Sequence, residues 1–234
     1  MGNLNQKWVN LTFIIDESGS MYGSQSDVVG GFKKTIDEQK ANKDGKVTVS
    51  LYKFSSTATQ VYLGKDINEI DGFEYTPHGN TAMNDGIGKA IDDVGAWLYE
   101  KDKNGEELPG VNLVVVMTDG MENSSTEYSL KQIQDKIKEQ TEKYSWQFIY
   151  EGVDITSSKV ADTLGFKFKT YSSRGKLANN YDTVSVATSA YRNLAKKGVS
   201  CEDSMLAFCS TLQEASMKNT ADYETEIGQK ISTD

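Results

Sequence analysis

The sequence predicts an α/β fold, a doubly wound, mainly parallel sheet with one antiparallel edge strand and helices on both faces. Strand-like and helix-like segments alternate along most of the chain, which is typical of parallel sheets with crossover helices. The run 111–117 is the most continuously apolar segment of the chain, as expected for a central strand covered on both sides. Only Ser55 and Ser56 separate two strand-like segments, and so short a connection requires an antiparallel pair.

The expected elements follow one another in a regular order. A strand at 8–15 precedes a helix at 27–40, whose apolar residues recur at three- and four-residue spacing. Strands at 46–54 and 57–63 form the antiparallel pair, and residues 66–80, rich in Gly and Asp with one Pro, are expected to form a loop. The remaining elements of the sheet region are expected to be helices at 82–99, 129–143 and 157–164 and strands at 111–117, 146–153 and 166–171.

The character of the chain changes beyond about residue 174. Two helices are expected there, at 179–196 and 202–218, and the polar tail from 220 is expected to be a short helix or disordered. We therefore divide the chain into a sheet domain at 1–174 and a helical extension at 175–234 that packs on it.

Two cysteines, Cys201 and Cys209, lie close together in one apparent helix, near the same face. A disulfide within one helix is geometrically poor. We expect both to be small buried apolar residues, as free cysteines commonly are.

Composition excludes several classes of protein. The 234 residues are 37% hydrophobic with only 2 Pro, which is typical of a folded chain. Lys and Arg number 25 against 34 Asp and Glu, so the formal net charge of −9 argues against a broad phosphate-binding surface and a nucleic-acid partner. The N-terminus does not resemble a signal peptide, and the apolar run 8–15 is too short to span a bilayer. We expect a cytoplasmic protein without a membrane partner.

Oxygen-bearing side chains lie on three segments that the predicted topology brings to one edge of the sheet. Asp16, Ser18 and Ser20 directly follow the first strand, Thr81 precedes a helix, and Asp119 follows the central strand. Ligands of doubly wound sheets bind beyond the carboxyl ends of the strands, near the switch in strand order. A hard cation such as Mg²⁺ takes oxygen ligands, so these residues are candidate metal ligands.

The same three segments carry a family resemblance. The sequences Asp-x-Ser-x-Ser at 16–20, Gly-x-Thr at 79–81 and Thr-Asp-Gly at 118–120 occur in this order. Together they resemble the von Willebrand factor type A (VWA) domain with its metal-ion-dependent adhesion site (MIDAS), over roughly residues 8–171. The resemblance implies a Rossmann-like VWA fold for the domain at 1–174. The helical segment 181–192 is similar to the tails of bacterial and phage members.

The resemblance also implies a role for each candidate residue. Ser18 and Ser20 would be direct hydroxyl ligands, and Thr81 a third whose coordination varies with conformation. Asp16 and Asp119 would hold metal-bound waters or bind directly. Neutral hydroxyls leave a dication such as Mg²⁺ (or Mn²⁺ or Ca²⁺) poorly neutralised, so an open position favours an Asp or Glu carboxylate from a partner. The expected function is non-enzymatic, metal-dependent protein binding.

Neighbouring residues leave alternatives open. Asp85 is either a carboxylate favoured by the dipole at the start of a helix or a participant in the metal site. Glu122 and Asn123 are either solvated or in contact with a partner. His78, the single histidine, is expected to be an ordinary loop residue. Ser18, Ser20 and Thr81 would serve only as helix caps if no cation binds.

Two alternative functions remain beside protein binding, and the first is an enzyme. A Mg²⁺-dependent phosphatase of the haloacid dehalogenase type needs a second acid two residues after the first, where this chain has Ser18. A serine hydrolase needs a Gly two residues before the nucleophile, which Ser18 lacks, and no Walker A or dinucleotide-binding sequence is present. The second alternative is an adaptor subunit of an ATPase-linked or phage-related assembly.

Overall fold

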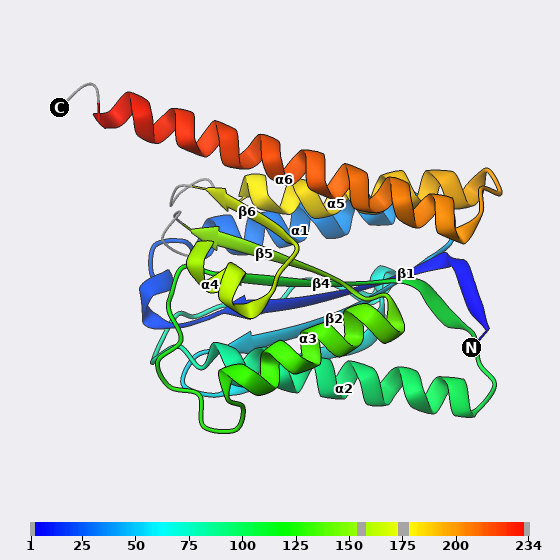
Figure 1. The fold of residues 1–234 in the computed structure, drawn as a ribbon, viewed down its shortest axis with the longest axis horizontal. Helices are drawn as coiled ribbons and strands as arrows, with labels where there is room; N and C mark the ends of the chain where they lie inside the picture. Colours follow the sequence, from blue (N-terminus) through cyan, green and yellow to red (C-terminus); the bar gives the residue numbers. More distant parts are fainter. Residues whose placement is uncertain (1–2, 154–157, 173–177, 232–234) are drawn as a thin grey trace.

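The computed structural model describes residues 3–153, 158–172 and 178–231, and it contains a six-stranded sheet in the order β3-β2-β1-β4-β5-β6 (Figure 1). The strands are β1 (Leu4–Asp16), β2 (Lys46–Phe54), β3 (Ala58–Asp66), β4 (Leu108–Thr118), β5 (Gln147–Val153) and β6 (Phe168–Ser172). All neighbouring strands are parallel except β2 and β3, which pair antiparallel at one edge. The predicted fold class is therefore confirmed.

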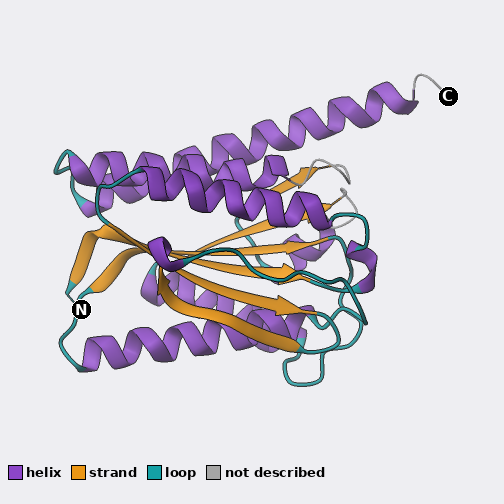
Figure 2. Ribbon diagram, turned by 180° about the vertical axis from the view of Figure 1, so that it is seen from behind, coloured by secondary structure: helices purple, strands orange, loops and turns teal. Residues whose placement is uncertain are grey.

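Helices cover both faces of the sheet (Figures 1 and 2). One layer contains α1 (Gln25–Ala41), α5 (Ala178–Lys196) and α6 (Cys201–Ile231), and the other contains α2 (Met83–Lys103), α3 (Leu130–Tyr144) and α4 (Ser158–Leu164). Two short 3₁₀ helices, η1 (Gly19–Met21) and η2 (Ile67–Glu69), interrupt the loops. Within the described ranges, no helix is both long and apolar enough to cross a membrane.

The central strand β1 shows why the sheet has a core on each side. Val9, Leu11 and Phe13 point into the core beneath α1 and α5, whereas Ile14 points into the core beneath α2 and α3. This alternation follows from the two-residue period of a strand. β1 begins four residues before the predicted start because Leu4 and Asn5 pair with Leu108 and Pro109 of β4.

The C-terminal region differs most from the prediction. α6 continues through the polar tail to Ile231, although a short helix or disorder was expected there. Three threonines within α6 donate their hydroxyls to backbone carbonyls four residues earlier in the same helix, so these residues do not interrupt it. The side chain of Tyr223 is buried against the core of the α2–α3–α4 layer, which gives the tail a tertiary contact.

α5 is part of the main core, since its Tyr181, Val184 and Tyr191 belong to the same cluster as β1 and α1. The predicted domain boundary at 174/175 lies outside the described residues. Cys201 and Cys209 both lie on α6 as free thiols, but they are half-buried, not buried as predicted.

α1 approaches α5 closely at Gly31. A Cβ on Gly31 would lie 2.2 Å from Cδ2 of Tyr181, whose ring is fully buried. Nothing lies within 4 Å of a Cβ on the adjacent Gly30. We expect Gly31→Ala to lower the free energy of unfolding by about 1–3 kcal/mol through overpacking. Gly30→Ala should raise it by about 0.5–1 kcal/mol through helix propensity.

Urea denaturation of the two variants and the wild type measures both effects. Each substitution adds one methyl group to the same helix, so the difference between them reports the contact with α5. Equal effects would show that α5 does not pack against α1 at Gly31.

Candidate metal centre

The predicted site lies where the strand order reverses. β1 has β2 on one side and β4 on the other, and both β1 and β4 end at the same edge of the sheet, with Ile15 opposite Met117. Asp16 is the last residue of β1 and Thr118 the last of β4. A crevice of this kind is where doubly wound sheets bind their ligands.

A chain of hydrogen bonds connects the first loop to the third. The hydroxyl oxygens of Ser18 and Ser20 lie 2.9 Å apart, and the Ser20 hydroxyl donates to Oδ1 of Asp119 at 2.6 Å. Ser20 and Asp119 are separated by 99 residues. The fold therefore brings these two segments into direct contact.

The carboxylate of Asp16 forms the floor of the site. It is fully buried, its Oδ1 accepts the backbone N–H of Ser18 at 2.7 Å, and its Oδ2 accepts the Thr118 hydroxyl at 2.5 Å. Burial raises the pKa of Asp16 to about 6, hydrogen bonds from Thr118 and Ser18 oppose the rise, and the charge of Asp119 adds to it. A cation at this place would favour the ionised carboxylate.

Thr81 completes the constellation, and its hydroxyl and the carboxylate of Asp16 both lie close to Gly120. A Cβ built on Gly120 would lie 3.2 Å from Oγ1 of Thr81 and 3.5 Å from Oδ2 of Asp16. A side chain at position 120 would therefore enter the space between these oxygens. The backbone N–H of Thr81 donates to Oδ1 of Asn123, and the backbone N–H of Asn123 donates to the carbonyl of Thr81. This reciprocal pair gives Asn123 a positioning role that the sequence did not predict.

The arrangement suits a hard cation. Asp16, Ser18 and Thr81 are buried, whereas Ser20 is exposed and Asp119 is partly exposed, so the oxygens line a site that is open on one side. Among the described residues, no three His, Cys, Asp or Glu side chains gather to hold a metal. The predicted set, with two carboxylates and three hydroxyls, does not depend on such a cluster, and all of its members are oxygen donors of the kind that Mg²⁺ and Ca²⁺ take.

The helix-capping alternative does not account for these hydroxyls. Ser18 is the N-cap residue of η1 but makes no side-chain capping bond, and the N-cap positions of α1 and α2 are Ser24 and Ala82. Ser20 instead contacts Asp119.

Backbone contacts fasten the loop after β1 to the loop before α2. The N–H of Gly19 donates to the carbonyl of Gly79 at 3.1 Å, and the N–H of His78 donates to the carbonyl of Glu17 at 2.8 Å. Oε1 of Glu17 accepts the ammonium of Lys53 at 2.8 Å. Sequence periodicity could not predict this role of Glu17, because its partners come from other elements. The ring nitrogens of His78 lie near Ser55 Oγ and the Thr76 carbonyl, as expected of a loop residue.

Asp85 holds the loop that precedes α3. Its Oδ1 accepts the backbone N–H groups of Glu127 and Tyr128, and its Oδ2 accepts that of Thr126, all at 2.9–3.0 Å. The carboxylate is thus occupied by three backbone donors. Of the two alternatives, the geometry favours a structural role over a competing metal ligand.

Glu122 has a similar role at the start of α2. Its Oε2 accepts the backbone N–H of Asn84, one of the N-terminal N–H groups of α2 without a partner inside the helix. Its Oε1 accepts the backbone N–H groups of Ser124 and Ser125. Glu122 therefore connects the loop after β4 to the helix that follows Thr81.

Comparisons with known proteins agree with this fold. A family model for the von Willebrand factor type A domain matches residues 10–149. No curated protein matches the chain.

Three solved structures with the same fold were compared. The vWF domain of the type V pili tip protein Mfa5 from Porphyromonas gingivalis is 11% identical, with a TM-score of 0.55 over 82% of this chain and 96% of that one. A von Willebrand factor type A structure from Catenulispora acidiphila is 14% identical (TM-score 0.52, 80% and 43% covered). Proximal thread matrix protein 1 from the mussel byssus, with a zinc-occupied MIDAS motif, is 20% identical (TM-score 0.54, 79% and 45% covered). The present chain thus spans less than half the length of the latter two.

Proposed function

The chain belongs to the von Willebrand factor type A domain family, and from this premise we propose that it is a non-enzymatic domain that binds a protein partner through a divalent cation. The cation is held by Asp16, Ser18, Ser20, Thr81 and Asp119 in the manner of a MIDAS, and Mg²⁺ is the proposed ion, with Mn²⁺ or Ca²⁺ as substitutes. The bacterial or phage origin, the cytoplasmic location and the lack of nucleic-acid and membrane partners stay predictions from the sequence.

The observation that carries the proposal is the contact between segments at the edge of the sheet. The Ser18, Ser20 and Asp119 oxygens form one chain of contacts, and Thr81 Oγ1 and Asp16 Oδ2 both lie close to Gly120. When bound, a divalent cation would be ligated directly by three neutral hydroxyls, with Asp16 and Asp119 holding metal-bound waters, so no anion in direct contact with the ion neutralises its charge. A partner carboxylate that completes the coordination is therefore favoured.

Two exposed apolar side chains beside the site support a protein partner. Tyr22 is 76% exposed and follows η1, and Met121 is 73% exposed and follows Gly120. Tyr and Met are enriched in protein–protein interfaces. We propose that these two side chains pack against the partner around its carboxylate. The zinc-occupied MIDAS motif of proximal thread matrix protein 1 supports a divalent ion at such a site.

Addition of Mg²⁺ or Mn²⁺ to metal-stripped protein is expected to raise its melting temperature. A ligand that binds only the folded state at about 100 times its Kd adds about 2.7 kcal/mol, which corresponds to roughly 5–10 °C for a chain of this size. Asp119→Ala should abolish the rise. Gly120→Val should also reduce it, because the added side chain crowds Thr81 Oγ1 and Asp16 Oδ2 without removing a ligand. Differential scanning fluorimetry measures these shifts.

The matched control is Asp135→Ala, which removes an exposed carboxylate paired with Lys131 on α3. This variant should keep the full metal-dependent rise. A rise of the same size in Asp119→Ala would remove this site from the proposal.

Turnover of phosphate or ester substrates with Mg²⁺ that is lost in Asp16→Asn would contradict the non-enzymatic part of the proposal. Binding of a protein partner is tested by a pull-down from the native host with Mg²⁺ and with chelator. Tyr22→Ala should lower capture of the partner, whereas its metal-dependent rise in melting temperature should stay intact.

A further inference from the structure

The segment that precedes α2 lies against the loop that carries the first candidate ligands. It begins after η2, and Figure 2 shows it running along the strands toward their carboxyl ends. Its contacts with the loop after β1 come from positions 75, 76, 78 and 79. Residues 73–79 are termed the strap.

The strap holds the backbone of the ligand-bearing loop. The hydroxyl of Tyr75 donates to the backbone carbonyl of Asp16 at 2.6 Å. Two backbone hydrogen bonds, at 2.8 Å and 3.1 Å, join positions 78–79 to positions 17–19. The strap therefore contacts the chain on both sides of Ser18.

Other backbone groups of the ligand-bearing loop are also occupied. The N–H of Glu17 donates to the carbonyl of Phe54 on β2 at 2.7 Å, and the carbonyl of Ser18 accepts the N–H of Met21 at 3.1 Å. The N–H of Ser18 donates to Oδ1 of Asp16. The loop is thus fixed by β2, by its own hydrogen bonds and by the strap.

Aromatic packing positions the ring of Tyr75. Its centroid lies 6.0 Å from that of Phe73, which lies 5.0 Å from that of Phe32 on α1, both in edge-to-face geometry. Phe32 packs in turn against Phe13 of β1 at 5.2 Å, and both of these rings are buried. Such pairs are favourable beyond the area that they bury. The Tyr75 hydroxyl is therefore held in place by the core.

We propose that Tyr75 is a positioning residue of the metal centre, whose hydroxyl holds the Asp16 carbonyl so that Asp16, Ser18 and Ser20 keep the geometry that binds a cation. The inference rests on the proposed cation site. Tyr75 acts through the backbone of a ligand and is not itself a ligand. Hydrogen-bond partners of metal ligands orient those ligands, and their loss typically weakens metal binding about 10–100-fold.

Tyr75→Phe tests the hydroxyl alone, because the ring and its packing are kept. Mn²⁺ is the probe, and isothermal titration calorimetry on metal-stripped protein measures its Kd. The Kd should rise about tenfold, at the lower end of the usual range, because the hydroxyl contacts the backbone of a ligand and not its side chain. An unchanged Kd would overturn the role of Tyr75.

Tyr62→Phe is the matched control. The partly buried hydroxyl of Tyr62 also donates to a backbone carbonyl, that of Gly72, one residue before the strap. Both variants lose one hydrogen bond of the same kind, so their urea midpoints should fall by similar amounts. Only Tyr75→Phe should bind Mn²⁺ more weakly. Equal weakening in both variants would indicate general loosening of the segment and would overturn a specific role for Tyr75.

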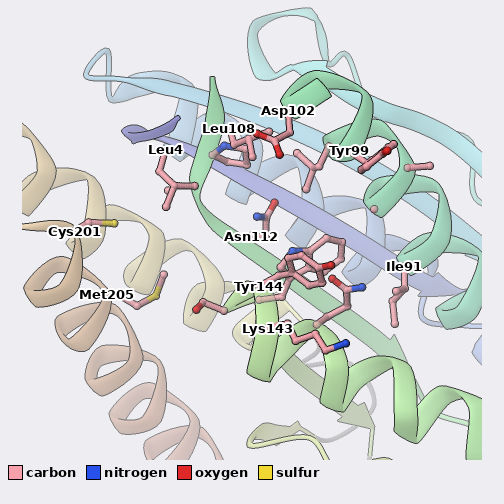
Figure 3. Close-up of a pocket in the computed structure, with 18 of the residues that line it drawn as sticks. Leu4, Ile91, Tyr99, Asp102, Leu108, Asn112, Lys143, Tyr144, Cys201 and Met205 are labelled. Carbon is pink, nitrogen blue, oxygen red and sulfur yellow. The ribbon is translucent and has the colours of Figure 1, made fainter. Parts of the chain in front are cut away.

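Tyr144→Phe is a remote control. Tyr144 is exposed at the end of α3 and lines a cavity of about 800 Å³ between α2, α3, β4 and α6 (Figure 3). Neither the candidate ligands nor the strap are among the described residues that line this cavity. The Mn²⁺ Kd of Tyr144→Phe should equal that of the wild type. A tenfold rise here would show that the effect does not depend on the strap.

Amide hydrogen exchange adds a readout that a purely structural role would not change. Coupling between two sites is reciprocal, so Mn²⁺ whose binding depends on the strap must also stabilise the strap. In the wild type, Mn²⁺ should slow exchange of the N–H groups of His78 and Gly19, which join the strap to the loop. The slowing should be smaller in Tyr75→Phe and complete in Tyr62→Phe. No slowing in the wild type would overturn the coupling.

Asp119→Ala separates this proposal from the cation site on which it rests. Loss of Mn²⁺ binding in Asp119→Ala together with an unchanged Kd in Tyr75→Phe would overturn only the role of Tyr75. A wild-type protein that binds no Mn²⁺ would overturn both proposals.

Discussion

Replacement of Arg192 by leucine is expected to lower the free energy of unfolding by about 3–5 kcal/mol, because several hydrogen bonds from a charged donor are lost at once and their acceptors are left without a donor. The guanidinium of Arg192 is buried on α5 and donates to backbone carbonyls of Gln39, Asn42 and Asp44 and to the side chain of Gln39, at 2.7–3.2 Å. α1 ends at Ala41, so these carbonyls lie at and beyond its C-terminus, where a helix lacks internal donors.

Arg192→Lys should recover only part of the stability, because an ammonium cannot reproduce the planar fork of donors. The control is Lys196→Ala, one turn further along α5. Lys196 forms an exposed ion pair with the side chain of Asp44 at 2.8 Å, and such pairs contribute about 0–1 kcal/mol. Guanidinium chloride unfolding measures all three variants. A cost for Arg192→Leu as small as that for Lys196→Ala would refute the role of Arg192 in fastening α5 to α1.

Glu151 is expected to make the protein less stable as the pH rises. Its side chain is fully buried on β5, and neither carboxyl oxygen has a hydrogen-bond partner within the described ranges. Burial raises the pKa of Glu151 to about 8, and the charge of Asp182 adds to the rise. The folded protein therefore keeps the carboxyl protonated over a range in which the unfolded chain, with a pKa of 4.5, has lost the proton.

Between these two pKa values the folded state binds more protons than the unfolded state, so the free energy of unfolding falls with rising pH. The fall should begin near pH 4.5 and end near pH 8, with a total on the order of 4–5 kcal/mol. Glu151→Gln should remove this dependence, because the amide has a similar shape and does not ionise. The free energy of unfolding of Glu151→Gln should therefore exceed that of the wild type only as the pH rises.

Urea unfolding at pH 5, 7 and 9 compares the two proteins. Glu142→Gln, at an exposed position on α3, is the control and should follow the wild type at each pH. If the free energy of unfolding changed with pH by the same amount in the wild type and in Glu151→Gln, Glu151 would not be buried as a neutral acid.

The sequence determined the elements and the edge of the sheet at which the candidate site lies. Strand and helix periodicities are local, and they predicted the alternating elements together with the antiparallel pair around Ser55 and Ser56. Parallel strands end at the same edge, so the positions of Asp16 and Asp119 after two such strands were enough to predict that they meet. The Ser20 to Asp119 contact agrees with that prediction.

Only the tertiary structure decided what the surrounding side chains do. Asp85 and Glu122 are acidic residues beside a candidate metal site, and the sequence left their roles open. The structure shows that Asp85 accepts backbone N–H groups from a loop about 40 residues away, and that Glu122 accepts them from its own loop and from Asn84 at the start of α2. The burial of Glu151 likewise depends on which helices cover the sheet. Periodicity reports which face of an element is apolar, but hydrogen-bond partners and cavities depend on distances between segments that are remote in the sequence.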